Sequence, residues 1–274
     1  MKSIAKKLFC PLMVLAALLL SFPAASAAEP TFNGTGTEVT VSETVNFSSR
    51  TVVSEGFLTA NSLHKYGTLS EYNDDCVPVA GSVVLGYYDL FDRTVIPGFN
   101  TGAYYNGSYI FLLQDSNVDN LIRDLYTRMN GGSGVSVDNF KTGLSSYLAA
   151  SGHSATYTSV KSGSSLNESL ICSKLDANQP VVIFLTKYAF AQSGAYNFGS
   201  NSDTLSLRVA SNRNHAVVAY GYQKIQYVVN GSTRTDVYLY VSFGTNELGV
   251  LRVSSTNSSA SVSGIYDAVA VSIS

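Results

Sequence analysis

The stretch YNDDCVPVAGSVVLGYYD, residues 72–89, is where a polar loop gives way to an apolar segment. Its small and apolar residues recur at helical spacing, which predicts a helix from Val77 to Leu90. Pro78 suits the first turn, where a missing N–H costs little. Gly81 and Gly86 weaken a helix, so we expect them to mark close packing against neighbouring elements. The stretch therefore places Cys76 where a loop meets a core helix.

Cys76 has the position of a reactive thiol. A thiolate at a helix start is stabilised by the positive end of the helix and by its unpaired N–H groups. Asp74 and Asp75, either of which could cap the first turn, oppose a low thiol pKa. A nearby imidazolium must outweigh these acids, or they must point away. The alternative is a cysteine that only packs at the start of the helix.

His215 is the best candidate for a base that acts on Cys76. It opens a predicted strand in SNRNHAVVAYGY, so its ring is expected at the rim of a sheet on a rigid element. A general base needs such a fixed position. The chain has two other histidines: His153 is expected in a surface turn, and His64 lies in the N-terminal region.

The first 27 residues have the pattern of a secretory signal peptide. Three lysines precede an apolar run from Leu8 to Phe22, and AASAAEP follows with small residues at Ala25 and Ala27. We expect cleavage after Ala27. The alternative is a membrane anchor, but the run is short for a spanning helix. The sequence thus predicts a secreted protein, extracellular or periplasmic, with no membrane association after cleavage.

Composition restricts the class of partner. Without the three signal-peptide lysines, the net charge changes from −2 to −5. A mildly acidic chain is a poor candidate for nucleic-acid binding, which favours clustered Lys and Arg. Only 13% of the residues are charged, while Tyr, Ser, Thr, Asn, Val and Gly are abundant, as in β-rich extracellular proteins. We expect a monomer.

Two cysteines remain after cleavage, Cys76 and Cys172. A disulfide between them is one interpretation in an oxidising compartment. The other is that Cys172 is a structural thiol, because it lies on a predicted helix among Leu170, Ile171 and Leu175.

The remaining chain divides into three parts. Residues 28–65 are polar and alternate, which predicts one or two strands, a loosely attached leader or a pro-segment. Residues 66–274 are expected to form one domain, mostly helical in the middle and a run of antiparallel strands in the last third. Segments 94–109 and 191–214 are predicted to be loops. Segregated helices and strands indicate an α+β fold.

Two further features concern helix starts. Asp115, Asn117 and Asp119 are spaced like the start of a calcium loop, but the glycine and glutamate of such a loop are missing. Helix capping explains them better. Ser136 is the predicted cap of the next helix.

Several segments resemble the papain-like cysteine peptidases. DCVPVAGSVVLGYYD is similar to their nucleophile helix, and closest to the bacterial branch related to bacteriocin-leader (double-glycine) peptidases. NHAVVAYGY resembles the histidine strand of that branch, and LDANQPVVIFL resembles the segment between them. The resemblance spans about residues 70–245, with the cysteine first and the histidine later, as in that superfamily.

The resemblance implies a papain-like fold, in which a helical part carrying the nucleophile helix packs on an antiparallel sheet. It also implies a thiol hydrolase that uses neither metal nor cofactor. Cys76 would attack a peptide carbonyl to form an acyl-enzyme, and His215 would take the thiol proton and later donate it to the leaving amine.

Two positions depart from the family pattern. An Asn or Asp usually orients the imidazole, but the corresponding region here is YVSFGTNELG, with Phe243 at that position. Asn246 is the expected substitute, and Glu247 is a weaker one. The family's oxyanion glutamine is replaced by Ser70, so Asn73 is the nearest amide, unless it is an ordinary turn residue. The backbone N–H of Cys76 could serve instead.

These departures leave two other functions open. One is a papain-like domain that has lost catalysis and binds a peptide or surface partner. The other is a thiol amidase or transpeptidase that acts on cell-wall peptides, because the same Cys–His pair serves all of these reactions.

Overall fold

The computed structural model describes residues 29–34, 36–72, 74–163 and 165–274. The predicted signal peptide, residues 1–27, lies outside them. The described part contains four helices: α1 (Cys76–Asp89), α2 (Ser116–Arg128), α3 (Val137–Ala150) and α4 (Glu168–Asp176). Among the described helices, none combines the length and the apolar character needed to cross a bilayer.

Ten strands form one antiparallel sheet, with the order β1-β10-β8-β13-β12-β11-β2. Strand β14 pairs with β8 and β5, β9 pairs with β10, and β8 also pairs with β11. The bounds of these strands are β1 (Glu38–Asn46), β2 (Ser49–Phe57), β5 (Ala155–Ser159), β8 (Val181–Gln192), β9 (Tyr196–Phe198), β10 (Ser202–Ala210), β11 (His215–Val229), β12 (Ser232–Ser242), β13 (Leu248–Ser255) and β14 (Gly264–Ile273). Separate hairpins are formed by β3 (Gly102–Tyr105) with β4 (Ser108–Phe111), and by β6 (Lys161–Ser162) with β7 (Ser165–Leu166).

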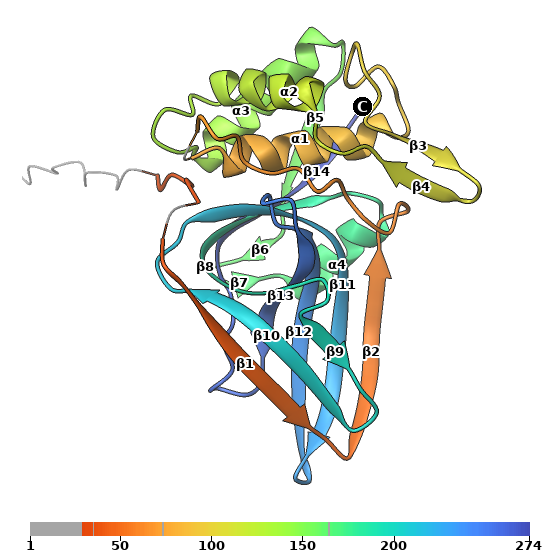
Figure 1. Ribbon diagram of the computed structural model, residues 1–274, viewed down its shortest axis with the longest axis vertical. Helices are drawn as coiled ribbons and strands as arrows, with labels where there is room; N and C mark the ends of the chain where they lie inside the picture. Colours follow the sequence, from red (N-terminus) through yellow and green to blue (C-terminus); the bar gives the residue numbers. More distant parts are fainter. Residues whose placement is uncertain (1–28, 35, 73, 164) are drawn as a thin grey trace, which may run out of the picture.

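The helices and the sheet form two parts of the molecule. Figure 1 shows α1, α2 and α3 gathered at one end of the sheet, whose strands converge toward the opposite end. The main core joins the two parts: Phe140 of α3 lies edge-on to Phe184 of β8, with ring centroids 5.6 Å apart. The predicted α+β class is confirmed, and the junction of the two parts is where α1 meets β11.

Three helix starts have side-chain caps. Asp115 accepts hydrogen bonds from the N–H groups of Asn117 and Val118, at 2.9 and 3.2 Å. Ser136 accepts one from Asn139, as predicted, and Asn167 caps α4. Such caps satisfy N–H groups that have no partner within the helix. Helix capping thus accounts for Asp115, and no cluster of metal-ligating residues occurs in the part of the chain that the structure describes.

Helix α1 is buried along almost its whole length. A β-carbon at Gly86 would lie 2.9 Å from His64 Nδ1, and one at Gly81 would lie 3.1 Å from the Met129 methyl carbon. Both glycines therefore permit close packing, as expected from the sequence. Neither Asp74 nor Asp75 caps α1 through its side chain, so that prediction is wrong.

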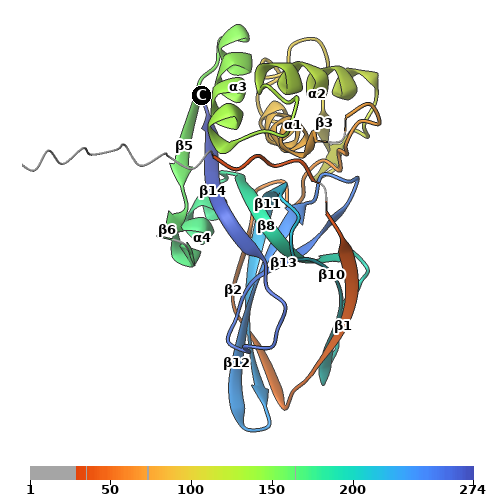
Figure 2. The ribbon, with the colours of Figure 1, turned by 90° about the vertical axis from the view of Figure 1, so that its left-hand side faces the viewer.

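Residues 38–57 form strands of the main sheet. Strand β1 pairs with β10, and β2 pairs with β11, so each lies at one end of the strand order. The preceding residues 29–34 run between the helices and the sheet before they reach β1, as Figure 2 shows in red. Phe32 joins this segment to the helical part through a bridge with Val135.

Two predicted loops contain strands. Segment 94–109 includes β3 and the start of β4, which are joined at Asn106 and Gly107. Both residues have positive φ, 49° and 81°, as a tight hairpin turn requires. Segment 191–214 contains β9 and β10, in which Leu205 and Leu207 alternate into the core. Abundant Gly, Asn and Ser concealed this alternation in the sequence.

Candidate active site

Cys76 is the first residue of α1, and its side chain is fully buried. Burial raises the pKa of its thiol to about 12. The backbone N–H groups of Ala216 and Val77 hydrogen-bond to the sulfur and oppose this rise, because they favour the thiolate. In this structure Cys76 is therefore a neutral thiol with two amides ready to stabilise its anion.

The two acids beside Cys76 turn away from it. Asp75 accepts a hydrogen bond from the Leu69 N–H, at 2.7 Å, and burial raises its pKa to about 6. Asp74 accepts hydrogen bonds from the Gly134 N–H and the Tyr126 hydroxyl, at 2.7 and 2.9 Å. These bonds fix the loop before α1, although the charge of Asp75 still raises the pKa of Cys76.

His215 is the first residue of β11 and is 1% exposed. Its position opposite Leu185 of β8 fixes its backbone. Its Nε2 lies 2.7 Å from the carbonyl oxygen of Phe243. A carbonyl only accepts, so Nε2 carries the proton and Nδ1 holds a free electron pair. Burial lowers the pKa of His215 to about 4, so the ring is neutral.

Cys76 and His215 both lie close to one point in space. A β-carbon built on Gly34 would be 3.5 Å from His215 Nδ1 and 4.0 Å from Cys76 Sγ. The nitrogen that faces this point is the one that can accept a proton. Among the described residues it has no hydrogen-bond partner. The fold thus brings the two predicted residues to a shared site, with the acceptor atom of the histidine directed into it.

The group that orients His215 is the Phe243 carbonyl rather than Asn246. Asn246 has a positive φ of 61°, and its side chain packs over Gly67, where a β-carbon would lie 2.6 Å from the amide nitrogen. The prediction that Asn246 orients the ring is therefore corrected. Glu247 does not replace it, because its carboxylate binds Arg208 and the Thr245 hydroxyl.

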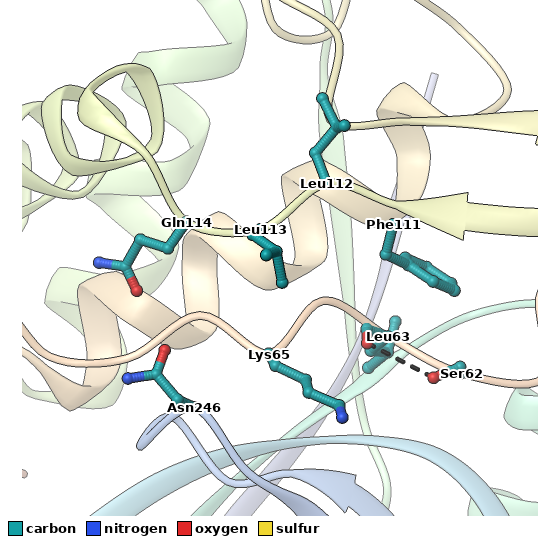
Figure 3. Close-up of a pocket in the computed structure, with 8 residues that line it drawn as sticks. All are labelled: Ser62, Leu63, Lys65, Phe111, Leu112, Leu113, Gln114 and Asn246. Atoms are coloured by element: carbon teal, nitrogen blue, oxygen red, sulfur yellow. Dashed lines mark hydrogen bonds between the residues drawn. The ribbon is translucent and has the colours of Figure 1, made fainter.

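Asn246 lines a cavity of about 450 Å³ that neither Cys76 nor His215 enters. Figure 3 shows its amide facing Gln114 across this cavity, with Leu113 and Lys65 nearby. Asn73, the predicted oxyanion donor, lies outside the described residues, and its role stays a prediction. Ser70, at the position of the family's glutamine, is exposed.

The other histidines and Cys172 lie elsewhere. His64 is buried against Thr101, with Nε2 2.6 Å from its carbonyl oxygen, and His153 contacts the Thr94 hydroxyl. Cys76 and Cys172 are both free, so the disulfide interpretation is wrong. Cys172 is half-buried on α4.

Arg213 is a cation beside the site that the sequence analysis did not identify. Arg213 donates from Nε to the Gly34 carbonyl and from a terminal nitrogen to Glu38 and Tyr188, at 2.8 and 2.9 Å. Tyr188 also donates its hydroxyl proton to Glu38. Arg213 stands two residues before His215, and that spacing was the available signal in the sequence.

One protein-family model matches most of the chain. Residues 63–245 match the family model described as Peptidase_C39 like family. The matched region includes both Cys76 and His215 but not residues 29–62. Searches of curated proteins and of solved structures gave no match.

Proposed function

Because this chain belongs to the Peptidase_C39 like family, we propose that it is a secreted cysteine peptidase that cleaves peptide bonds through Cys76 and His215. The observation that carries the proposal is the free Nδ1 of His215, which faces the same point as the Cys76 sulfur at the start of α1. The fold is proposed to be papain-like, with the helices and the sheet as the two walls of the peptide cleft. Secretion rests on the pattern of residues 1–27.

The chemistry begins with a proton transfer. His215 Nδ1 takes the proton of the Cys76 thiol, and the resulting thiolate forms a C–S bond to the peptide carbonyl carbon. The carbonyl oxygen becomes an oxyanion near the Cys76 N–H, which is unpaired within the helix and lies at its positive end. The C–N bond then breaks, and the amine leaves with the proton from Nδ1. This step produces a thioester.

Water completes the reaction. His215 takes a proton from the water, the hydroxide oxygen bonds to the thioester carbon, and the C–S bond breaks. The sulfur recovers its proton from the imidazolium. Throughout, the Phe243 carbonyl accepts the Nε2 proton and holds the ring. A carbonyl carries only a partial charge, so it orients the ring with less stabilisation of imidazolium than a carboxylate would give.

The test is hydrolysis of a broad peptide library under reducing conditions. We expect turnover by the wild-type chain to be lost in both Cys76→Ala and His215→Ala. Cys172→Ser is the matched control, because that thiol lies on α4 away from the site, and it should retain turnover. Hydrolysis that persists in Cys76→Ala would rule out the thiol mechanism.

A binding-only domain is the second candidate. It is favoured by the complete burial of Cys76 and His215, which leaves both groups neutral in this structure. Peptide binding without hydrolysis, unchanged in Cys76→Ala, would support it. Transpeptidation needs the same pair with an amine in place of water, so product analysis with an added amine separates it from hydrolysis.

A further inference from the structure

Residues 29–34 form an N-terminal segment whose last residue, Gly34, lies against the two reactive side chains. The α-carbon of Gly34 is placed so that an added β-carbon would be in ordinary contact with His215 Nδ1, Cys76 Cβ and Cys76 Sγ. Gly34 has a φ of +71°, a conformation that glycine adopts without cost. The segment therefore fills the space that a substrate carbonyl would need.

The segment is hydrogen-bonded to the helical wall like an extended peptide. The Phe32 N–H donates to the Val135 carbonyl at 3.0 Å, and the Val135 N–H donates back to Phe32 at 3.3 Å. The Phe32 side chain is fully buried, with its ring centroid 5.1 Å from that of Phe184 and 5.6 Å from that of Tyr266. The backbone pair thus attaches the segment to the loop before α3, whereas the Phe32 ring anchors it on strands β8 and β14.

The segment is also hydrogen-bonded to the sheet wall. The Gly34 N–H donates to the Asn214 carbonyl at 2.7 Å, and the Asn214 amide donates to the Thr31 carbonyl at 2.9 Å. Arg213 donates to the Gly34 carbonyl and is itself held by Glu38, the first residue of β1. The main chain on both sides of Phe32 is therefore engaged by the residues just before His215.

We propose that residues 29–34 act as a built-in pseudosubstrate that occupies the peptide cleft and keeps the peptidase inactive until it is displaced. The proposal rests on the proposed function, and it adds a specificity element: the pocket filled by Phe32 takes a large aromatic or apolar side chain of the substrate. The segment lies outside residues 63–245, so it is a feature of this chain beyond the matched family region.

Two observations explain how a peptide can sit at the site uncut. The Gly34 carbonyl oxygen is held by the Arg213 guanidinium, which fixes it in a ground-state contact. In addition, the covered site excludes water, which raises the pKa of Cys76 and lowers that of His215, so proton transfer between them is unfavourable. Displacement of the segment admits water and reverses both shifts.

The position of the segment is tested by a cross-link. A β-carbon at Gly34 would lie 3.7 Å from Cys76 Cβ, within the range of about 3.5–4.5 Å found in disulfides. The full chain with Gly34→Cys should therefore form a disulfide with Cys76 on mild oxidation, detected by peptide mapping. Thr37→Cys is the matched control, because Thr37 is exposed three residues further along the chain, and it should not cross-link. Equal cross-linking of the two variants would refute the placement.

Inhibition is tested by the rate at which iodoacetamide labels Cys76 in the full chain, with the label located by peptide mapping. Phe32→Asp places a charge in the apolar pocket and should release the segment. We expect Cys76 to be labelled about tenfold faster or more than in wild type, as expected for a thiol that gains solvent exposure. Cys172, the half-exposed thiol, should be labelled at an unchanged rate, which shows that the variant is folded.

A synthetic peptide with residues 29–36, EPTFNGTG, provides the second arm. Added to the Phe32→Asp variant, it should restore protection of Cys76. The same peptide with Ala in place of Phe should bind about tenfold more weakly or worse, because the aromatic ring is no longer buried. Equal protection by both peptides would contradict the Phe32 subsite.

These readouts separate the two proposals. If Phe32→Asp exposes Cys76 but hydrolyses no peptide, the pseudosubstrate covers the site and the proposed peptidase function fails. If Cys76 is labelled equally fast in wild type and Phe32→Asp, the pseudosubstrate is refuted whether or not peptides are cleaved. Cleavage of the chain itself near Gly34, seen only when Cys76 is present, would show the segment to be a substrate rather than an inhibitor.

Discussion

His215 directs its proton-bearing nitrogen at the main-chain carbonyl of Phe243, 2.7 Å away. The aromatic side chain of Phe243 also packs on the imidazole, with ring centroids 4.6 Å apart. One residue thus provides both the hydrogen-bond acceptor and an apolar cover for the base. A main-chain acceptor cannot be removed by substitution, which makes the orientation of His215 insensitive to the side chains that follow.

Asn246→Ala should leave catalysis almost unchanged. Its side chain packs on Gly67 and lines a separate cavity, so we expect a change of about 0.5 kcal/mol, roughly a factor of two in kcat/KM. His215→Ala, the comparison, should reduce kcat/KM by about 10²- to 10⁴-fold, because the general base is lost. Steady-state kinetics on one cleaved peptide measures both. If Asn246→Ala reduces kcat/KM nearly as much as His215→Ala does, Asn246 takes part in catalysis.

Stability should fall as the pH drops from 6.5 toward 4. Burial lowers the pKa of both His64 and His215 to about 4, so the unfolded chain takes up two protons that the folded chain resists. Each histidine contributes a loss on the order of 1.4 kcal/mol for each pH unit in this window. The raised pKa of Asp75, about 6, acts in the opposite direction below pH 6 and offsets part of the loss.

Urea unfolding at pH 7 and pH 5 checks this prediction. His215→Asn and His64→Asn should each reduce the difference in unfolding free energy between the two pH values. A wild-type free energy that is the same at both pH values, with no change in either variant, would contradict the burial of neutral histidines.

Gly86→Ala should destabilise the protein. The added methyl group would lie 2.9 Å from His64 Nδ1 in a packed core, and overpacking of this kind costs about 1–3 kcal/mol. Gly132→Ala is the matched control, because nothing lies within 4 Å of its β-carbon position. Denaturant midpoints of the two variants give the comparison. Equal midpoints would mean that α1 and His64 can move apart freely.

Glu38→Gln should loosen the segment over the active site. The carboxylate holds Arg213 at 2.8 Å, and Arg213 in turn holds the Gly34 carbonyl, so loss of the charge weakens both contacts. We expect Cys76 to be alkylated several-fold faster, about threefold or more for a charge-assisted bond. Glu55→Gln, on the other edge strand, is the control, and its rate should match wild type. If Glu38→Gln is alkylated at the same rate as that control, Glu38 does not help to hold residues 29–34 over Cys76.

The sequence located the two candidate residues correctly at the starts of their elements because each element is strongly patterned. Helical spacing located Cys76 at the start of α1, and a run of small and β-branched residues located His215 at the start of β11. Ser136, a polar residue just before a helical pattern, was likewise predicted to be a helix cap, and it caps α3 in the structure.

The rest depended on long-range contacts that leave no local pattern. The group that orients His215 is a main-chain carbonyl. Every residue has one, so the side chain at position 243 could not indicate this role. The contact between Gly34 and Cys76 joins a polar segment to a helix that follows two strands. Strand β10 was missed because it pairs along its whole length with β1, which is distant in sequence, and this tertiary pairing overrode a loop-like composition.

The two edge strands limit where the proposed peptidase could be cut during maturation. Strand β1 begins at Glu38, only a few residues after Gly34, and β1 and β2 complete opposite ends of the main strand order. Proteolytic removal of residues 29–34 that keeps the sheet intact must therefore cut between Gly34 and Glu38. A cut after residue 57 would remove both strands and leave one edge of β10 and one edge of β11 unpaired, and such exposed edges promote aggregation.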